Sequence, residues 1–65
     1  MEYRVDLYTA AALFERTERF IARNEAEAVV TARGLVVGHN AGYALVYTAD
    51  GNGSTGFVAK VGAER

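Results

Sequence analysis

Two stretches of the chain have nearly the same order of residues, and this near-repeat constrains the fold more than any other feature. Tyr-Thr-Ala at residues 8–10 is followed after nine residues by Phe-Ile-Ala-Arg at 20–23, and Tyr-Thr-Ala at 47–49 is followed after seven residues by Phe-Val-Ala-Lys at 57–60. Each copy places a β-rich run, a turn-length gap and a second β-rich run in the same order. The near-repeat therefore predicts two β-hairpins.

The first hairpin starts with a strand over residues 2–9, where Tyr3, Val5 and Leu7 alternate with more polar neighbours. The connection after it is ambiguous, because residues 10–16 contain good helix formers and no Gly, Pro, Asn or Asp. A helix over about residues 10–23 is an alternative on local propensity alone. The second copy has Asp-Gly-Asn-Gly at 50–53, a strong hairpin signal, so residues 17–23 are predicted to be the second strand.

A helix is predicted between the hairpins. Asn24 followed by Glu27 has the spacing of an N-cap with a carboxylate that reaches back to the cap, and the helix is expected to run to about Val37. Gly38 is expected to take the left-handed closing position. Gly34, inside the helix, indicates either the close approach of another backbone or simple tolerance.

The apolar surface of this helix is wider than one sheet requires. The stripe predicted to face inward consists of Ala28, Val29, Ala32, Leu35 and Val36. Ala26, Val30 and Val37 extend the apolar arc, which Arg33 interrupts, so a second contact is expected on that flank.

The strand expected at residues 43–49 is apolar on both faces, with Tyr43, Leu45 and Tyr47 on one of them. Together with a fourth strand from Phe57, the elements predict one α+β domain over residues 1–65, with two β-hairpins flanking one α-helix (ββαββ). The helix packs on one face of an antiparallel or mixed four-stranded sheet. Because one helix covers only one face, we expect a homodimer. The residues expected at the dimer or partner interface are Tyr43, Leu45, Tyr47, Val30 and Val37.

Composition narrows the functional classes. The chain has no cysteine and a single histidine, His39, so no disulfide, metal or cofactor is expected. A net charge of −1 gives no general attraction to nucleic acid or to an anionic membrane. The apolar runs are too short to cross a bilayer and the first residues lack a signal-peptide pattern, so we expect a cytoplasmic protein.

The segment Gly-Asn-Gly-Ser-Thr-Gly at 51–56 matches the G-x-G-x-x-G pattern of phosphate-binding loops. Such loops require a helix directly after them, whereas a β-type run follows here, so a hairpin connection is the preferred interpretation. A small-ligand site at residues 50–56 is a minor alternative. Ser54 and His39 are each the only residue of their type, and nothing in the sequence brings them together. No catalytic residue is predicted, and the protein is not expected to be an enzyme.

Aromatic and cationic residues on the predicted strands provide the main functional alternatives. A sheet face could stack bases and bind phosphates through Arg4, Tyr8, Arg19, Arg23 and Lys60. Tyrosine and arginine are also enriched in protein interfaces, and the acidic residues that alternate with these cations repel a phosphate backbone. We therefore expect a protein-interaction module, such as a bacteriophage or mobile-element accessory factor, with nucleic-acid binding as the alternative.

One longer pattern covers about two thirds of the chain. It reads Phe-x-Ala-Arg-Asn-Glu-Ala-Glu-Ala-Val-Val-x-Ala-Arg from Phe20 and Gly-Tyr-x-Leu-Val-Tyr-x-x-Asp-Gly from Gly42. This order resembles a family of short uncharacterised bacterial proteins with a hairpin, a helix that contains Ala-Arg, and a second hairpin with an Asp-Gly turn. The matching residues are Ala26, Ala28, Ala32, Arg33, Leu45, Val46, Asp50 and Gly51. The resemblance implies the ββαββ order and no catalytic or binding residue. The chain differs from the family at residues 10–12, where a polar turn is expected.

Overall fold

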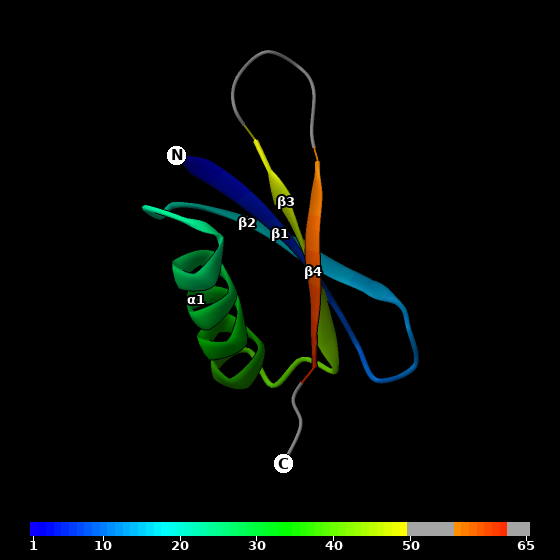
Figure 1. Ribbon diagram of the computed structural model, residues 1–65. Helices are drawn as coiled ribbons and strands as arrows, with labels where there is room; N and C mark the ends of the chain where they lie inside the picture. The colour runs from blue at the N-terminus through cyan, green and yellow to red at the C-terminus, as the bar shows by residue number, and fades with distance from the viewer. Residues whose placement is uncertain (50–55, 63–65) are drawn as a thin grey trace.

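The computed structural model describes residues 1–49 and 56–62, and it has the ββαββ order that the near-repeat predicts. Its elements are β1 (Glu2–Tyr8), β2 (Phe14–Ile21), α1 (Glu25–Gly38), β3 (Tyr43–Thr48) and β4 (Phe57–Gly62). In the described residues the strands form one sheet in the order β2-β1-β3-β4, and each neighbouring pair is antiparallel. The helix lies on one side of this sheet (Figure 1). The expected fold class is therefore confirmed.

The second strand replaces the helix that local propensity allows over residues 10–23. It starts at Phe14 rather than at residue 17 and ends at Ile21 rather than at residue 23, so the predicted bounds are wrong by two or three residues. Pairing with β1 from Phe14 to Ile21, interrupted only by a register shift at Glu15, supplies the backbone hydrogen bonds that these residues would otherwise make within a helix. The turn before it forms without glycine because Ala12 adopts a left-handed φ of 67°.

The helix begins as predicted. Asn24 is the N-cap and its side chain accepts a hydrogen bond from the Glu27 amide at 2.9 Å, while the Glu27 carboxylate accepts one from the Arg23 amide at 2.8 Å. Its end differs from the prediction, because Gly38 is still helical and the left-handed residue is Asn40, with a φ of 55°. Asparagine tolerates this conformation better than most residues, so the chain needs no glycine there.

The core lies between α1 and three strands of the sheet. The helix packs on β4 and β3 and to a smaller extent on β1. All of the core residues are apolar, and their side chains are buried: Tyr3, Val5, Leu7, Ala22, Ala28, Ala32, Val36, Ala41, Ala44, Val46 and Val61. Strand β2 lies beyond this cover, and most of its residues are exposed.

Gly42, which follows the helix, and Gly34, which lies inside it, differ in what surrounds them. A Cβ on Gly42 would lie 2.4 Å from the Ala10 amide nitrogen, so this glycine permits the β1–β2 connection to touch the start of β3. The Gly42 amide also donates to the Tyr8 carbonyl at 2.8 Å. A Cβ on Gly34 would meet no atom of the described residues within 4 Å, so no backbone of the described chain approaches it.

Candidate functional site

Both hairpins bring a tyrosine and a phenylalanine together at the same structural position. Tyr8 of β1 pairs with Phe14 of β2, and Tyr47 of β3 pairs with Phe57 of β4, each directly after a shift in strand register. The two ring pairs have almost the same geometry, with centroids 5.8 Å apart and interplanar angles of 75° and 74°. The counterpart of Phe57 is therefore Phe14. The near-repeat aligns Phe57 with Phe20 instead, which is wrong, because Phe20 pairs with Tyr3 at the other end of the hairpin.

A threonine beside each tyrosine closes its hairpin. The Thr9 amide donates to the Leu13 carbonyl at 2.9 Å, and the Leu13 amide donates to Thr9 Oγ1 at 3.2 Å. The Thr48 amide donates to the Gly56 carbonyl at 2.9 Å, and the Gly56 amide donates to Thr48 Oγ1 at 2.9 Å. This pair of hydrogen bonds, the threonine clasp, places each phenylalanine next to its tyrosine. The two Tyr-Thr pairs of the near-repeat therefore have the same structural role, each at the closed end of its hairpin.

The tyrosines belong to the sheet face that α1 does not cover, which we call the open face. Alternation along the strands places Arg4, Asp6 and Tyr8 of β1 on it, opposite the buried Tyr3, Val5 and Leu7. Tyr43, Leu45 and Tyr47 of β3 lie beside them. The strand register adds Phe14, Thr17, Arg19 and Ile21 of β2 and Phe57 and Lys60 of β4. The β3 side chains are half-buried, whereas Phe57 is 61% exposed.

The aromatic rings of the open face contact one another and two cations. The Tyr8 and Tyr43 rings are stacked, with centroids 5.1 Å apart and an interplanar angle of 4°. Lys60 Nζ lies 4.8 Å from the centre of the Tyr43 ring, and Arg4 Cζ lies 4.5 Å from the centre of the Tyr47 ring. These cation–π contacts come from opposite sides of β3, because Lys60 belongs to β4 and Arg4 to β1.

Ion pairs on the open face offset part of its positive charge. Arg4 Nε lies 3.4 Å from Asp6 Oδ1, without the geometry of a hydrogen bond, and Arg4 Nη2 donates to Asp6 Oδ2 at 3.4 Å. The Thr17 hydroxyl donates to Asp6 Oδ1 at 2.8 Å, and Arg19 Nη1 lies 3.3 Å from a carboxylate oxygen of Glu2. Partial desolvation, and then the nearby Asp6 carboxylate, raise the pKa of the Tyr8 hydroxyl. The face thus combines uncharged phenol groups with paired charges.

The flat faces of the tyrosine rings are largely occupied. Tyr43 has Tyr8 on its β1 side and Lys60 on its β4 side, while Tyr47 has the Arg4 guanidinium against its ring and Phe57 in edge contact. A nucleobase stacks on an exposed ring face. A ligand of the open face would instead meet ring edges, hydroxyl groups and the Leu45 side chain.

The residues expected at an interface fall into two groups on opposite sides of the molecule. Tyr43, Leu45 and Tyr47 lie together on the open face. Val30 and Val37 are 67% and 70% exposed and lie on the side of α1 that faces away from its buried residues. One contact surface does not contain both groups.

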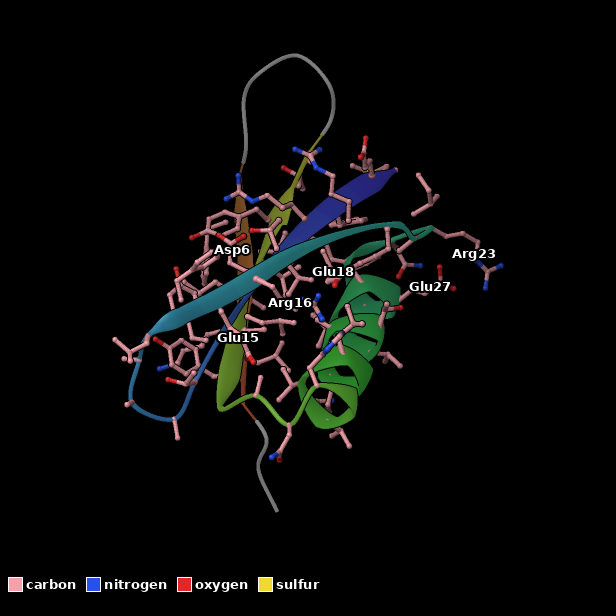
Figure 2. All side chains as sticks on the ribbon, turned by 180° about the vertical axis from the view of Figure 1, so that it is seen from behind. Asp6, Glu15, Arg16, Glu18, Arg23 and Glu27 are labelled. Atoms are coloured by element: carbon pink, nitrogen blue, oxygen red, sulfur yellow. The ribbon has the colours of Figure 1, made fainter. Side chains whose placement is uncertain are left out.

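The residues of the nucleic-acid alternative are also divided. Arg4, Tyr8, Arg19 and Lys60 belong to the open face, as described above. Arg23 lies at the start of α1, where its guanidinium contacts the Glu27 carboxylate at 3.1 Å, and Figure 2 shows both side chains there, away from Asp6. The Arg23 hydrogen bonds, from its backbone first and then from its side chain, lower the pKa of Glu27.

A polar cluster that sequence reasoning missed joins β2 to the end of α1. Arg16 Nη1 lies 3.0 Å from His39 Nδ1 and Arg16 Nε lies 3.4 Å from Glu18 Oε2, while His39 Nε2 lies 3.8 Å from the same glutamate oxygen. Figure 2 shows Arg16 and Glu18 between β2 and the helix. Strand alternation would have placed residues 16 and 18 on one face, but only the fold brings His39 to them. Because arginine has no acceptor, a hydrogen bond between these two side chains uses His39 Nδ1 as the acceptor.

Comparisons of the chain with protein-family models, with curated proteins and with solved structures found no match. Within residues 1–49 and 56–62, no three side chains of the metal-binding types lie close enough together to hold an ion. No helix in this part of the chain has the length and apolar character needed to span a membrane. The small-ligand alternative at residues 50–56 falls almost entirely outside the described residues, which include only Gly56 of that segment.

Proposed function

We propose that the protein is a small, non-enzymatic protein-interaction module of the cytoplasm that acts as a homodimer and binds its partner through the open face. The observation that carries this proposal is the set of Tyr43, Leu45 and Tyr47 on a sheet face that the helix leaves uncovered. The proposal includes a role as an accessory factor of a bacteriophage or mobile element.

The chemistry of the open face supports a protein partner. Tyrosine, phenylalanine and arginine are enriched in protein interfaces, where rigid rings bury much area at small entropic cost. Here the stacking of Tyr8 on Tyr43 and the contact of Arg4 with Tyr47 already restrain the side chains before any partner arrives. Binding would therefore lose little further side-chain freedom.

Nucleic-acid binding is the second candidate, and the cations Arg4, Arg19 and Lys60 on the open face favour it. The carboxylates beside both arginines and the occupied tyrosine ring faces weigh against it. Titration with single- and double-stranded oligonucleotides at low salt separates the two candidates, because phosphate contacts are strongest there. We expect no binding under that condition.

The direct test is capture of partners from a host lysate with matched surface variants. Leu45→Asp places a carboxylate in the centre of the open face, between Asp6 of β1 and Lys60 of β4, whereas Val30→Asp places one on the outer side of the helix. We expect the unmodified protein and Val30→Asp to retain the same captured protein and Leu45→Asp to lose it. Loss with Val30→Asp alone would move the binding surface to the helix and refute the assignment to the open face.

A further inference from the structure

The exposed edge strand β2 has a charge pattern that is complementary to itself. Residues 15–19 read Glu-Arg-Thr-Glu-Arg. If two copies of this segment pair antiparallel about Thr17, each Glu15 lies opposite Arg19 of the other copy, and each Arg16 lies opposite Glu18. Opposite charges in directly opposed positions stabilise a strand pair, and like charges destabilise it. The other edge strand, β4, has Lys60 as its only charged residue and offers no such match.

The backbone of β2 is available in the same register. The Met1 and Ala22 backbones exchange hydrogen bonds at 3.0 Å in both directions, which identifies a hydrogen-bonded pair of the β1–β2 ladder. Because such pairs alternate, Glu18 and Phe20 also direct their backbone groups to β1, and Thr17 and Arg19 direct theirs outward. A pairing centred on Thr17 uses the outward groups of Thr17, so hydrogen bonding at this residue and charge complementarity select the same register. Glu15, which lies opposite Arg19 in this pairing, is at the register shift of the β1–β2 ladder.

The side chains of this segment are accessible to a second copy. The Arg16, Glu18 and Arg19 side chains are 49%, 35% and 60% exposed, so their contacts with Glu18, His39 and Glu2 leave room for further partners. Apolar residues flank the charged segment on both sides, with Phe14 58% exposed at one end and Ile21 75% exposed at the other. In an antiparallel pair the Phe14 end of one copy meets the Ile21 end of the other.

We propose that two copies of this chain join edge to edge through antiparallel β2 strands, with a twofold axis at Thr17. The two sheets then form one continuous sheet, with both helices on one side and both open faces on the other. This inference rests on the homodimer in the proposed function and assigns that contact to the β2 edge, which borders the partner-binding face and shares Thr17 and Arg19 with it. The edge pairing also provides hydrogen-bond partners for backbone groups of β2 that would otherwise have none in the sheet.

Charge reversal tests the register. In Glu15→Arg both residues 15 and 19 are positive, and in Arg19→Glu both are negative, so each homodimer opposes like charges. Sedimentation equilibrium of the unmodified protein should give a dimer, and each variant alone should raise the dissociation constant about tenfold or more. An equimolar mixture of the two variants restores complementary charges and should restore the dimer as a heterodimer. A strictly monomeric unmodified protein, or variants that dimerise as it does, would overturn the proposal.

A second pair of variants tests the backbone contact. Thr17→Pro removes an amide that points away from β1, so the four-stranded sheet should persist while the dimer is lost. Thr17→Val removes the hydroxyl bond to Asp6 but keeps the amide, and it should remain dimeric. Circular dichroism verifies that both variants fold. A dimer in a folded Thr17→Pro variant contradicts edge pairing.

The two proposals fail in different experiments. At a concentration where Glu15→Arg is monomeric, this variant should still capture the open-face partner, and Leu45→Asp should still dimerise. If Leu45→Asp abolishes the dimer while Glu15→Arg leaves it intact, the copies meet through the open face and not through β2. If both variants dimerise and capture normally, both surface assignments are wrong.

Discussion

The two hairpins share their closure but differ in what covers them. Each ends in a threonine clasp and a Tyr–Phe edge contact of nearly identical geometry. The helix packs on both strands of the second hairpin, whereas in the first it reaches β1 and leaves β2 largely exposed. Equivalent local structure can thus support a buried role in one hairpin and a surface role in the other. This difference in cover makes β2, the exposed strand of the first hairpin, a candidate contact surface.

Polar contacts connect β2 to its neighbours where apolar cover is missing. Thr17 bonds to Asp6, Arg19 pairs with Glu2, and the Arg16–Glu18–His39 cluster reaches the end of the helix. Exposed ion pairs of this kind contribute little each, so the β1–β2 ladder remains the main restraint. An edge held in this way keeps its side chains accessible to a second copy.

The largest effect is expected where the first hairpin touches the start of the second. Gly42→Ala would place a Cβ 2.4 Å from the Ala10 amide nitrogen, and a backbone atom cannot rotate aside. We expect a loss of about 3 kcal/mol in the free energy of unfolding, because the two segments must separate. Urea denaturation measures it. As a control, Gly34→Ala has free space around its Cβ and should be neutral or stabilising by up to about 1 kcal/mol.

The two edge strands should respond differently to truncation. Val61 of β4 is 2% exposed and Ile21 of β2 is 75% exposed. Val61→Ala should lower the free energy of unfolding by about 2 kcal/mol through lost burial and a small cavity. Ile21→Ala should change it by less than about 0.5 kcal/mol when measured on the monomeric Glu15→Arg background. Equal losses would mean that β2 is covered after all.

The threonine clasps offer a test of equivalence between the hairpins. Thr48→Val removes a hydroxyl that accepts a hydrogen bond from the Gly56 amide, and Thr9→Val removes one that accepts from the Leu13 and Ala11 amides. Because the clasp amide loses its partner in both cases, we expect each variant to lose about 1 kcal/mol in the free energy of unfolding. Thr→Ser at the same positions keeps the hydroxyl and serves as the control. A loss confined to one hairpin would show that the clasps contribute unequally.

The smallest effect concerns the start of the helix that joins the hairpins. Arg23 lowers the pKa of Glu27 through its backbone and then its side-chain hydrogen bond. The resulting stabilisation is fully present above the ordinary glutamate pKa and is lost as the pH falls through the lowered value. Glu27→Gln should therefore reduce the melting temperature slightly at neutral pH. The two proteins should converge in acid, and thermal melts over a pH series measure this difference.

Sequence patterns were sufficient to predict the elements that depend on interactions between residues close in the chain. The alternation of Tyr3, Val5 and Leu7 predicted a strand with one buried face, and the Asn24–Glu27 spacing predicted the helix start. They were insufficient at residues 10–23, where good helix formers form a turn and a strand. Local propensity amounts to a few tenths of a kcal/mol per residue, and the hydrogen bonds of an eight-residue pairing with β1 outweigh it.

The candidate site was predictable only in part. Alternation grouped Tyr43, Leu45 and Tyr47, and the expected covering of one sheet face by one helix predicted an uncovered side. The stacking of Tyr8 on Tyr43 and the separation of Val30 and Val37 from that face required the strand order β2-β1-β3-β4. Strand order depends on contacts between distant segments, which residue spacing does not encode.

The sequence by itself determined the elements of this protein, their order and the residues with a tendency to be buried, because these follow from local periodicity and capping. It also contains the self-complementary charges of residues 15–19. Only the tertiary structure decided that this segment is an edge strand with outward backbone groups and that Phe14 is the partner of Tyr8. The physical reason is that the helix covers β1, β3 and β4 only. The hydrogen bonds between β2 and β1 stabilise β2 enough for it to remain in the sheet while exposed.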